Sequence, residues 1–148
     1  RTDVRFVDAG IIRKILKERV DQIQDAMGVS DDLARAMLLK NGWNADLVLR
    51  NFAEDCDYIK NTFGFELGAI ELPTGEHDVL CPVCFCEYPL VECTFLQDCG
   101  HGLCTYCYTG YLGSKVTDGI ESVLSVCPEQ KCNMLVPERL FVELLEPA

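Results

Sequence analysis

The sequence has no apolar run that approaches the roughly 18 residues of a membrane-spanning helix, so we expect no membrane partner. It lacks an initiator methionine, and its opening Arg1-Thr2-Asp3 is not a secretory signal. We therefore expect a piece of a longer protein. Basic residues are scarce, 13 against 24 acidic ones, which gives a net charge of −11. Because a phosphate backbone needs a basic surface, this balance argues against a nucleic-acid partner.

The few basic residues are also unevenly distributed. Ten of the thirteen precede residue 81, and only Lys115, Lys131 and Arg139 follow. The second half should therefore offer an acidic or neutral surface. Such a surface suits a basic protein partner, although it is more often simply a source of solubility.

Cysteine is abundant and clustered. Nine of the ten cysteines lie between Cys81 and Cys132. Without a secretory signal, such a cluster indicates metal binding rather than disulfides. We expect a reducing compartment, which means the cytoplasm or the nucleus.

The first half, residues 8–65, has a helical pattern. An apolar stripe steps along it by three and four residues, at Ile12, Leu16, Val20, Ile23 and Met27. Asp8, Ser30 and Asn44 are expected helix N-caps, and Gly28 and Gly42 are expected to end helices. The pattern predicts a mainly α domain of three short helices. A further helix with an apolar face is expected to extend it, through Tyr58, Ile59 and Phe63.

The remaining boundaries follow from composition. Residues 1–7 are expected to form an N-terminal tail. Residues 66–78 contain Gly68, Pro73 and Gly75 among several acids, so they are predicted to be a linker. Residues 79–148 form the second expected domain. Its last helix should begin near Pro137 and pack inward through Leu140, Phe141 and Leu144.

The second half carries a set of potential metal ligands. Two residues between cysteines allow one turn to aim both sulfurs at the same ion, and thiolates with imidazole suit tetrahedral zinc. One such pair alone could be chance or a redox motif, but the repeated pattern favours two structural Zn²⁺ sites. The eight predicted ligands are Cys81, Cys84, Cys99, His101, Cys104, Cys107, Cys127 and Cys132.

Two pairings of these ligands are possible. Sequential pairing, as in LIM-type modules, would join Cys81 and Cys84 to His101 and Cys104, and would then need a cysteine near Gly110, where none occurs. Interleaved pairing uses every ligand, because it places the first and third ligand pairs on one ion and the second and fourth on the other. We favour the interleaved, cross-braced form.

Three cysteines are left over. Cys56 is expected to be a buried helix residue. Cys86 and Cys93 could each replace Cys99 as a ligand. A nucleophilic Cys93 would need a nearby base; His101 is expected to bind zinc and His77 to be solvated in the linker. We expect no catalytic residue here.

The zinc motif resembles the RING finger, the docking module of ubiquitin ligases. Four residues separate Cys127 from Cys132, where an ordinary RING has two. This spacing resembles the first RING of RING-between-RING (RBR) ligases of the Ariadne branch, and so does Asn133, where ordinary RINGs often carry a basic residue. The resemblance implies a small α+β domain that recruits a ubiquitin-charged conjugating enzyme.

The first half resembles the UBA-like domain that precedes this RING in Ariadne ligases. Met27-Gly28-Val29 at a helix end, followed by Trp43, carries that resemblance. It implies that Met27 and Val29 contact a ubiquitin-like modifier attached to a cullin-RING ligase. The alternative is a packed three-helix bundle with no ligand, because apolar helix faces are usually core.

The resemblance also implies that recruitment and catalysis belong to different domains of the ligase. The nucleophilic cysteine of the family lies in a second RING, so no cysteine of this chain is assigned that role. Pro82 and Val83 on one zinc loop and Pro128 on the other are expected to meet the conjugating enzyme, with Tyr108 or Tyr111 beside them. Two alternatives are a self-sufficient RING ligase and a non-enzymatic adaptor stapled by zinc.

Overall fold

The computed structural model describes residues 8–68 and 71–146, and the predicted N-terminal tail lies outside them. The chain divides into two compact units, one that ends at Cys56 and one that begins at Asp57. Residues 57–65, which the sequence grouped with the helical half, therefore lie in the second unit. No helix within the described residues is long and apolar enough to cross a membrane.

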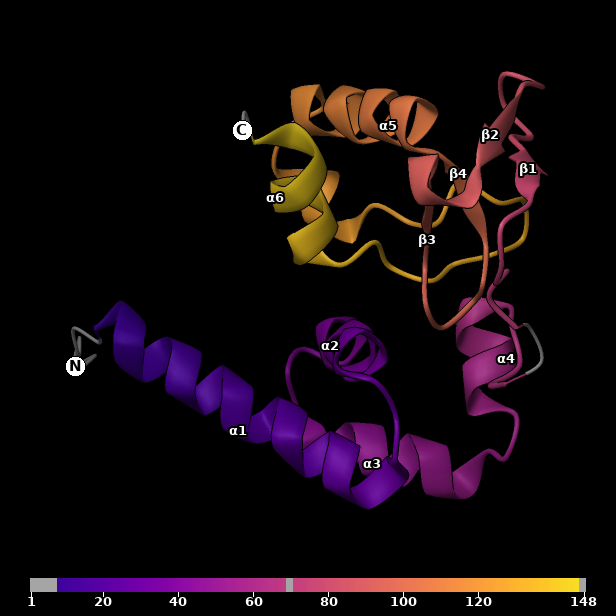
Figure 1. Ribbon diagram of the computed structural model, residues 1–148. Coiled ribbons are helices and arrows are strands. Elements are labelled where there is room, and N and C mark those ends of the chain that lie inside the picture. Colours follow the sequence, from indigo (N-terminus) through magenta and orange to yellow (C-terminus); the bar gives the residue numbers. More distant parts are fainter. Residues whose placement is uncertain (1–7, 69–70, 147–148) are drawn as a thin grey trace. The chain divides into compact units, whose positions relative to one another are not determined.

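The first unit contains three helices, α1 (Ala9–Met27), α2 (Asp31–Lys40) and α3 (Ala45–Glu54) (Figure 1). Their N-caps are the predicted ones. The side chains of Asp8, Ser30 and Asn44 each accept a hydrogen bond from a backbone amide in the first helical turn. The sequence therefore marked each helix start correctly.

The core of this unit lies where α1 meets α2 and α3. Val20 and Ile23 are the buried residues of α1, whereas Ile11, Ile12 and Ile15 are exposed. The predicted apolar stripe is therefore covered only along the second half of α1. α2 supplies most of the remaining core, through Leu33, Ala34, Ala36, Met37 and Leu38.

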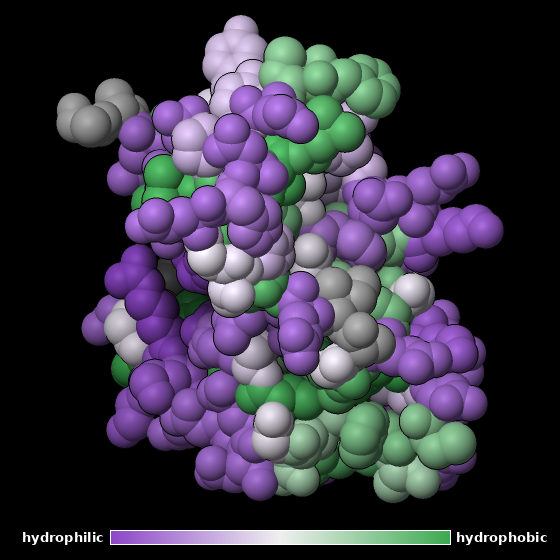
Figure 2. Space-filling model, turned by 45° about the vertical axis from the view of Figure 1, so that its right-hand side comes forward, coloured by the Kyte–Doolittle hydropathy of each residue, from purple (hydrophilic) through white to green (hydrophobic). Residues whose placement is uncertain are grey.

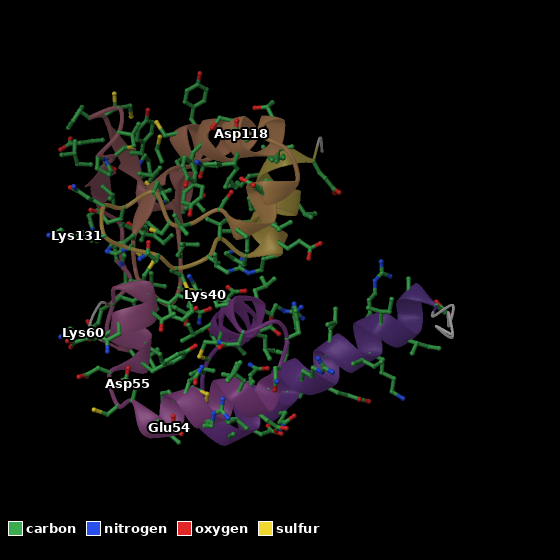
Figure 3. All side chains as sticks on the ribbon, turned by 180° about the vertical axis from the view of Figure 1, so that it is seen from behind. Lys40, Glu54, Asp55, Lys60, Asp118 and Lys131 are labelled. Atoms are coloured by element: carbon green, nitrogen blue, oxygen red, sulfur yellow. The ribbon has the colours of Figure 1, made fainter. Side chains whose placement is uncertain are left out.

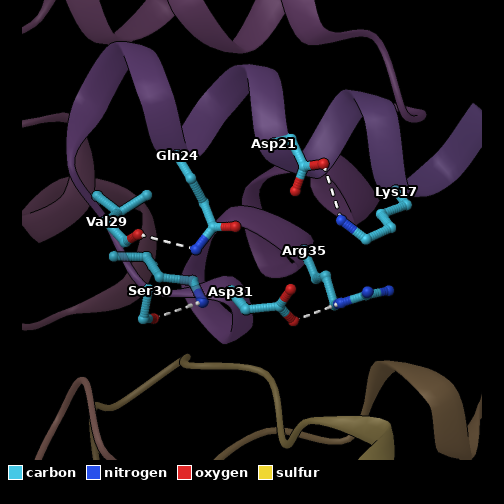
Figure 4. A network of polar contacts seen from close by, with 8 residues as sticks. Lys17, Asp21, Gln24, Val29, Ser30, Asp31 and Arg35 are labelled. Atoms are coloured by element: carbon cyan, nitrogen blue, oxygen red, sulfur yellow. Dashed lines mark hydrogen bonds and ion pairs between the residues drawn. The ribbon is translucent and has the colours of Figure 1, made fainter.

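Polar contacts connect the surface of α1 with the start of α2 (Figure 4). The side-chain amide of Gln24 donates to the backbone oxygen of Val29 at 3.3 Å. Lys17 pairs with Asp21 one turn away, as Arg35 does with Asp31 on α2. These ion pairs are solvent-exposed, so each contributes at most a few tenths of a kcal/mol.

The second unit combines small sheets with helices. Strands β1 (Asp78–Leu80) and β2 (Glu87–Pro89) form one antiparallel pair, and β3 (Cys93–Phe95) and β4 (Gly102–Cys104) form another. The helices are α4 (Tyr58–Phe63), α5 (Thr105–Thr117) and α6 (Glu138–Leu145), with 3₁₀ turns η1 (Leu90–Glu92) and η2 (Ile120–Leu124).

The core of the second unit is formed largely by α5 and the segment before α6. Tyr108 and Leu112 of α5 are buried, as are the consecutive residues Met134, Leu135 and Val136. α6 begins directly after Pro137, which is its N-cap rather than part of its first turn. The whole protein is thus mainly helical, with small sheets that position the cysteine-bearing loops.

Candidate functional site

The loop between β1 and β2 presents the first two predicted ligands. The amide of Cys81 donates to the oxygen of Cys86 at 2.9 Å, and the amide of Phe85 donates to the oxygen of Cys81 at 2.9 Å. Phe85 has a positive φ of 59°, which lets the chain turn sharply here. This tight turn aims Cys81 and Cys84 toward one point.

A second pair of cysteines completes the first group. Cys104 ends β4 and caps α5, where its sulfur accepts the amide hydrogen of Cys107 at 3.4 Å. The ligand atoms of Cys81, Cys84, Cys104 and Cys107 all lie within 4.8 Å of one another. A strand end, a helix start and a hairpin loop thus converge on one four-thiol group.

The second group is built from two loops. The turn from Leu96 to His101 closes through the Gly100 amide, which donates to the oxygen of Leu96 at 2.9 Å. It brings Cys99 and His101 next to Cys127 and Cys132, with all four ligand atoms within 4.8 Å of one another. The groups are therefore interleaved along the chain, and sequential pairing of His101 with Cys81 and Cys84 does not occur.

The distances within the groups fit tetrahedral metal binding. Ligand atoms about 2.3 Å from a tetrahedral zinc ion lie about 3.8 Å apart. The Cys99 and Cys127 sulfurs are 3.9 Å apart, and those of Cys84 and Cys104 are 4.0 Å apart. The Cys127 sulfur lies 3.7 Å from Nδ1 of His101. Both groups could therefore each hold a metal ion, and the thiol-rich donor sets suit zinc.

Without a cation, the thiols of one group cannot all ionise. Hydrogen bonds from Cys127 and then Cys99 lower the pKa of Cys132 to about 2. In the same group, hydrogen bonds with Cys132 and Cys99 raise the pKa of Cys127. One thiol in a group thus loses its proton while another keeps it. A divalent cation would remove this conflict, because it stabilises several thiolates at once.

The three remaining cysteines lie outside both groups. Cys56 is exposed between α3 and α4, so its predicted burial is wrong: the helix ends before it. The exposed Cys86 thiol donates to the oxygen of Cys84 at 3.6 Å. The Cys93 thiol donates to the oxygen of Pro89 at 3.7 Å, and burial raises the pKa of Cys93. A raised pKa disfavours the thiolate that a nucleophile requires.

A shallow groove lies between the two cysteine-bearing loops. Pro82 and Val83 from the first loop and Pro128 from the second, the residues expected to meet the conjugating enzyme, contribute to its lining. Its other lining residues are His101, Gly102, Leu103, Glu129 and Gln130. Val83 is 57% exposed although it is apolar. The groove therefore offers apolar side chains that closed loops hold in place.

Two predicted contact residues are buried instead. Tyr108 has no exposed surface, because its ring is part of the core of the second unit, so its assignment to a partner surface is wrong. Val29 in the first unit is only 9% exposed, which also contradicts a contact role. Met27 is half-buried. Tyr111 is half-buried as well, and its hydroxyl donates to the oxygen of Val126 at 2.6 Å.

Sequence reasoning missed Phe85 as a surface residue. Its side chain is 75% exposed, in the same loop as Val83. Figure 2 shows that hydrophobic areas of this kind interrupt a largely hydrophilic surface. The available signal was an aromatic residue between Cys84 and Cys86, in a loop too tight to bury it.

Comparison with known proteins shows relatives named as E3 ubiquitin-protein ligases. ARI6 of Arabidopsis thaliana is 31% identical over 121 residues, which is 82% of this chain and 21% of the relative. The rbrA protein of Dictyostelium discoideum is 27% identical over 141 residues, which is 90% of this chain and 26% of the relative. The dbl4 protein of Schizosaccharomyces pombe is 25% identical over 143 residues, which is 96% of this chain and 28% of the relative. No protein-family model matches the chain.

Proposed function

The chain resembles Ariadne-type RING-between-RING E3 ubiquitin ligases over most of its length, and from this premise we propose that it recruits a ubiquitin-charged conjugating enzyme. It spans only about a quarter of the length of these relatives, with shares of 21%, 26% and 28%. The activity of the whole protein is therefore part of this proposal.

The observation that carries the proposal is the groove between two cross-braced loops. Two four-ligand groups fix the loops from which Val83 and Pro128 project. Side chains held in advance lose little conformational entropy on binding, which favours association. The exposed ring of Phe85 extends the apolar area of the first loop.

We assign two structural zinc ions to the two groups. With all four ligand positions of each ion taken by protein, neither ion would have an open position for a reactive water. When bound, zinc would supply folding energy and loop rigidity. Its coordination would also require reduced thiols, which supports a cytoplasmic or nuclear location.

We propose no catalytic role for any cysteine of this chain. Seven of the ten would serve as zinc ligands, and the thiols of Cys86 and Cys93 donate to backbone oxygens rather than to a histidine. The chain would therefore bind and orient the charged conjugating enzyme, and transfer of ubiquitin to a nucleophilic cysteine would occur on another part of the ligase.

For the first unit we propose binding of a ubiquitin-like modifier, such as one attached to a cullin. The support is sequence resemblance and a three-helix arrangement. Since Val29 is buried, Met27 is the better candidate contact at the end of α1. The alternative of a non-enzymatic adaptor would rest on this unit alone. An adaptor would bind the modifier and would have no affinity for any conjugating enzyme.

The first experiment is a calorimetric titration of the zinc-loaded chain with a panel of ubiquitin-conjugating enzymes. We expect saturable binding by at least one of them. Val83→Ala should weaken that binding about tenfold, as truncation of a central interface residue commonly does, with unchanged zinc content. Val91→Ala is the matched control, because Val91 is 91% exposed and lies outside the groove.

Two outcomes would redirect the proposal. Equal binding by the two valine variants would contradict a docking role for the groove. If the chain by itself also accelerated ubiquitin discharge from the conjugating enzyme to free lysine, it would act as an ordinary RING ligase rather than as a recruitment module.

A further inference from the structure

The loop between Cys127 and Cys132 lines the groove and also meets the end of α4. Its residues Pro128, Glu129 and Gln130 line the groove. The next residue, Lys131, lies against the end of α4. Seen from behind, Lys60 of α4 and Lys131 extend on the same side of the second unit (Figure 3).

Backbone contacts join α4 to this loop directly. The amide of Asn133 donates to the oxygen of Phe63 at 2.7 Å. A Cβ placed on Gly64 would overlap the backbone oxygen of Lys131, so only glycine permits this approach. Gly64 also has the positive φ of 82° that ends α4 in the left-handed conformation.

The apolar side chains of α4 are shielded from solvent. Phe63 has no exposed surface, and Tyr58, Ile59 and Phe65 are also buried. After the helix the chain folds back, and Lys60 Nζ pairs with Glu66 at 2.6 Å. At its carboxyl end, the helix meets the Cys127–Cys132 loop through the backbone of Phe63 and Gly64.

Candidate zinc ligands stand at both ends of the loop, and the Cys127 amide donates to the oxygen of Met134 at 2.7 Å. The amide of Cys132 donates to the oxygen of Glu129 at 3.2 Å, which is a contact inside the loop, and Lys131 has a positive φ of 68°. A non-glycine residue in that conformation is uncommon and needs surrounding contacts to hold it. The end of α4 provides such contacts.

We propose that α4 holds the Cys127–Cys132 loop in its docking conformation, so that Phe63 and Gly64 are positioning residues for the recruitment of the conjugating enzyme. This inference rests on the proposed function, because the loop carries Pro128 of the groove. It predicts that changes at the end of α4 alter docking, although α4 contributes no residue to the groove.

The test compares two glycines of one segment. Gly64→Ala and Gly68→Ala both put alanine at a positive φ, 82° and 71°, but nothing lies within 4 Å of a Cβ at Gly68. We expect Gly64→Ala in the zinc-loaded chain to speed hydrogen exchange of the Asn133 amide about tenfold or more. It should also weaken binding of the panel's tightest conjugating enzyme about tenfold. Zinc content should remain at two ions per chain.

Identical behaviour of the two glycine variants in both measurements would overturn the inference. If Gly64→Ala does not fold, Phe63→Leu replaces it; faster Asn133 exchange then supports the inference, and unchanged exchange overturns it. If the unmodified chain binds no conjugating enzyme, the proposed function fails separately. The exchange measurement still decides in that case whether α4 holds the loop.

Discussion

Cys99 shows how much a single side chain contributes to the second ligand group. Its thiol is fully buried, 3.9 Å from the sulfur of Cys127, in a turn that also presents His101. A hydroxyl in its place would be a much harder ligand than a thiolate and would leave three good donors. The other group shares no ligand with it.

We therefore expect Cys99→Ser to reduce bound zinc from about two ions per chain to about one, by native mass spectrometry or metal analysis. Cys86→Ser is the matched control, since Cys86 is exposed and outside both groups, and it should retain both ions. Two ions in Cys99→Ser would instead indicate that another cysteine replaces Cys99.

At the scale of elements, the short β3–β4 pair sets the distance between the two ligand groups. β4 ends at Cys104 of the first group, and the turn that enters it carries Cys99 and His101 of the second. Gly102 faces Phe95 across the pair, and a Cβ on Gly102 would collide with the Phe95 ring. The strands can pair this closely only because this residue has no side chain.

We expect Gly102→Ala to destabilise the second unit by about 1–3 kcal/mol, as overpacking typically does, and to lower its melting temperature by several degrees. Gly110→Ala on α5 serves as the control, because nothing lies within 4 Å of its Cβ and alanine favours a helix. A melting temperature for Gly102→Ala equal to that of the control in thermal unfolding would contradict this role.

At the scale of the whole molecule, all eight candidate ligands belong to the second unit. Structural zinc contributes on the order of 10 kcal/mol, which is comparable with the whole stability of a domain. Within residues 8–56, the described part of the first unit, the core consists of apolar helix contacts and contains no candidate metal ligand group. The stability of the two units should therefore respond differently to loss of metal.

Chelation at neutral pH should unfold the second unit and leave the three helices of the first. The chromophores separate the two responses, since Trp43, the only tryptophan, lies in the first unit and all five tyrosines lie in the second. We expect tyrosine signals to change while Trp43 emission and part of the far-ultraviolet helix signal persist. Simultaneous loss of both signals would show that the first unit depends on metal.

The sequence by itself determined the features that depend on near neighbours. Helix starts follow from Asp8, Ser30 and Asn44, because a cap bonds to an amide in the next turn. The candidate ligands could be named because closely spaced cysteines share a turn. The resemblance to Ariadne-type ligases also came from this spacing, and the relatives confirm it.

Only the tertiary structure decided what is buried and which distant segments meet. Tyr108 lies in the core while Phe85 and Cys56 are exposed, although all three are apolar positions in the sequence. The choice between two ligand pairings was likewise settled by the geometry of the groups, in which His101 meets Cys127. Burial and long-range pairing depend on residues far apart in the chain, so no local pattern specifies them. The contact of Gly64 with Lys131 is an example of long-range pairing, because 66 residues of the chain lie between these two residues.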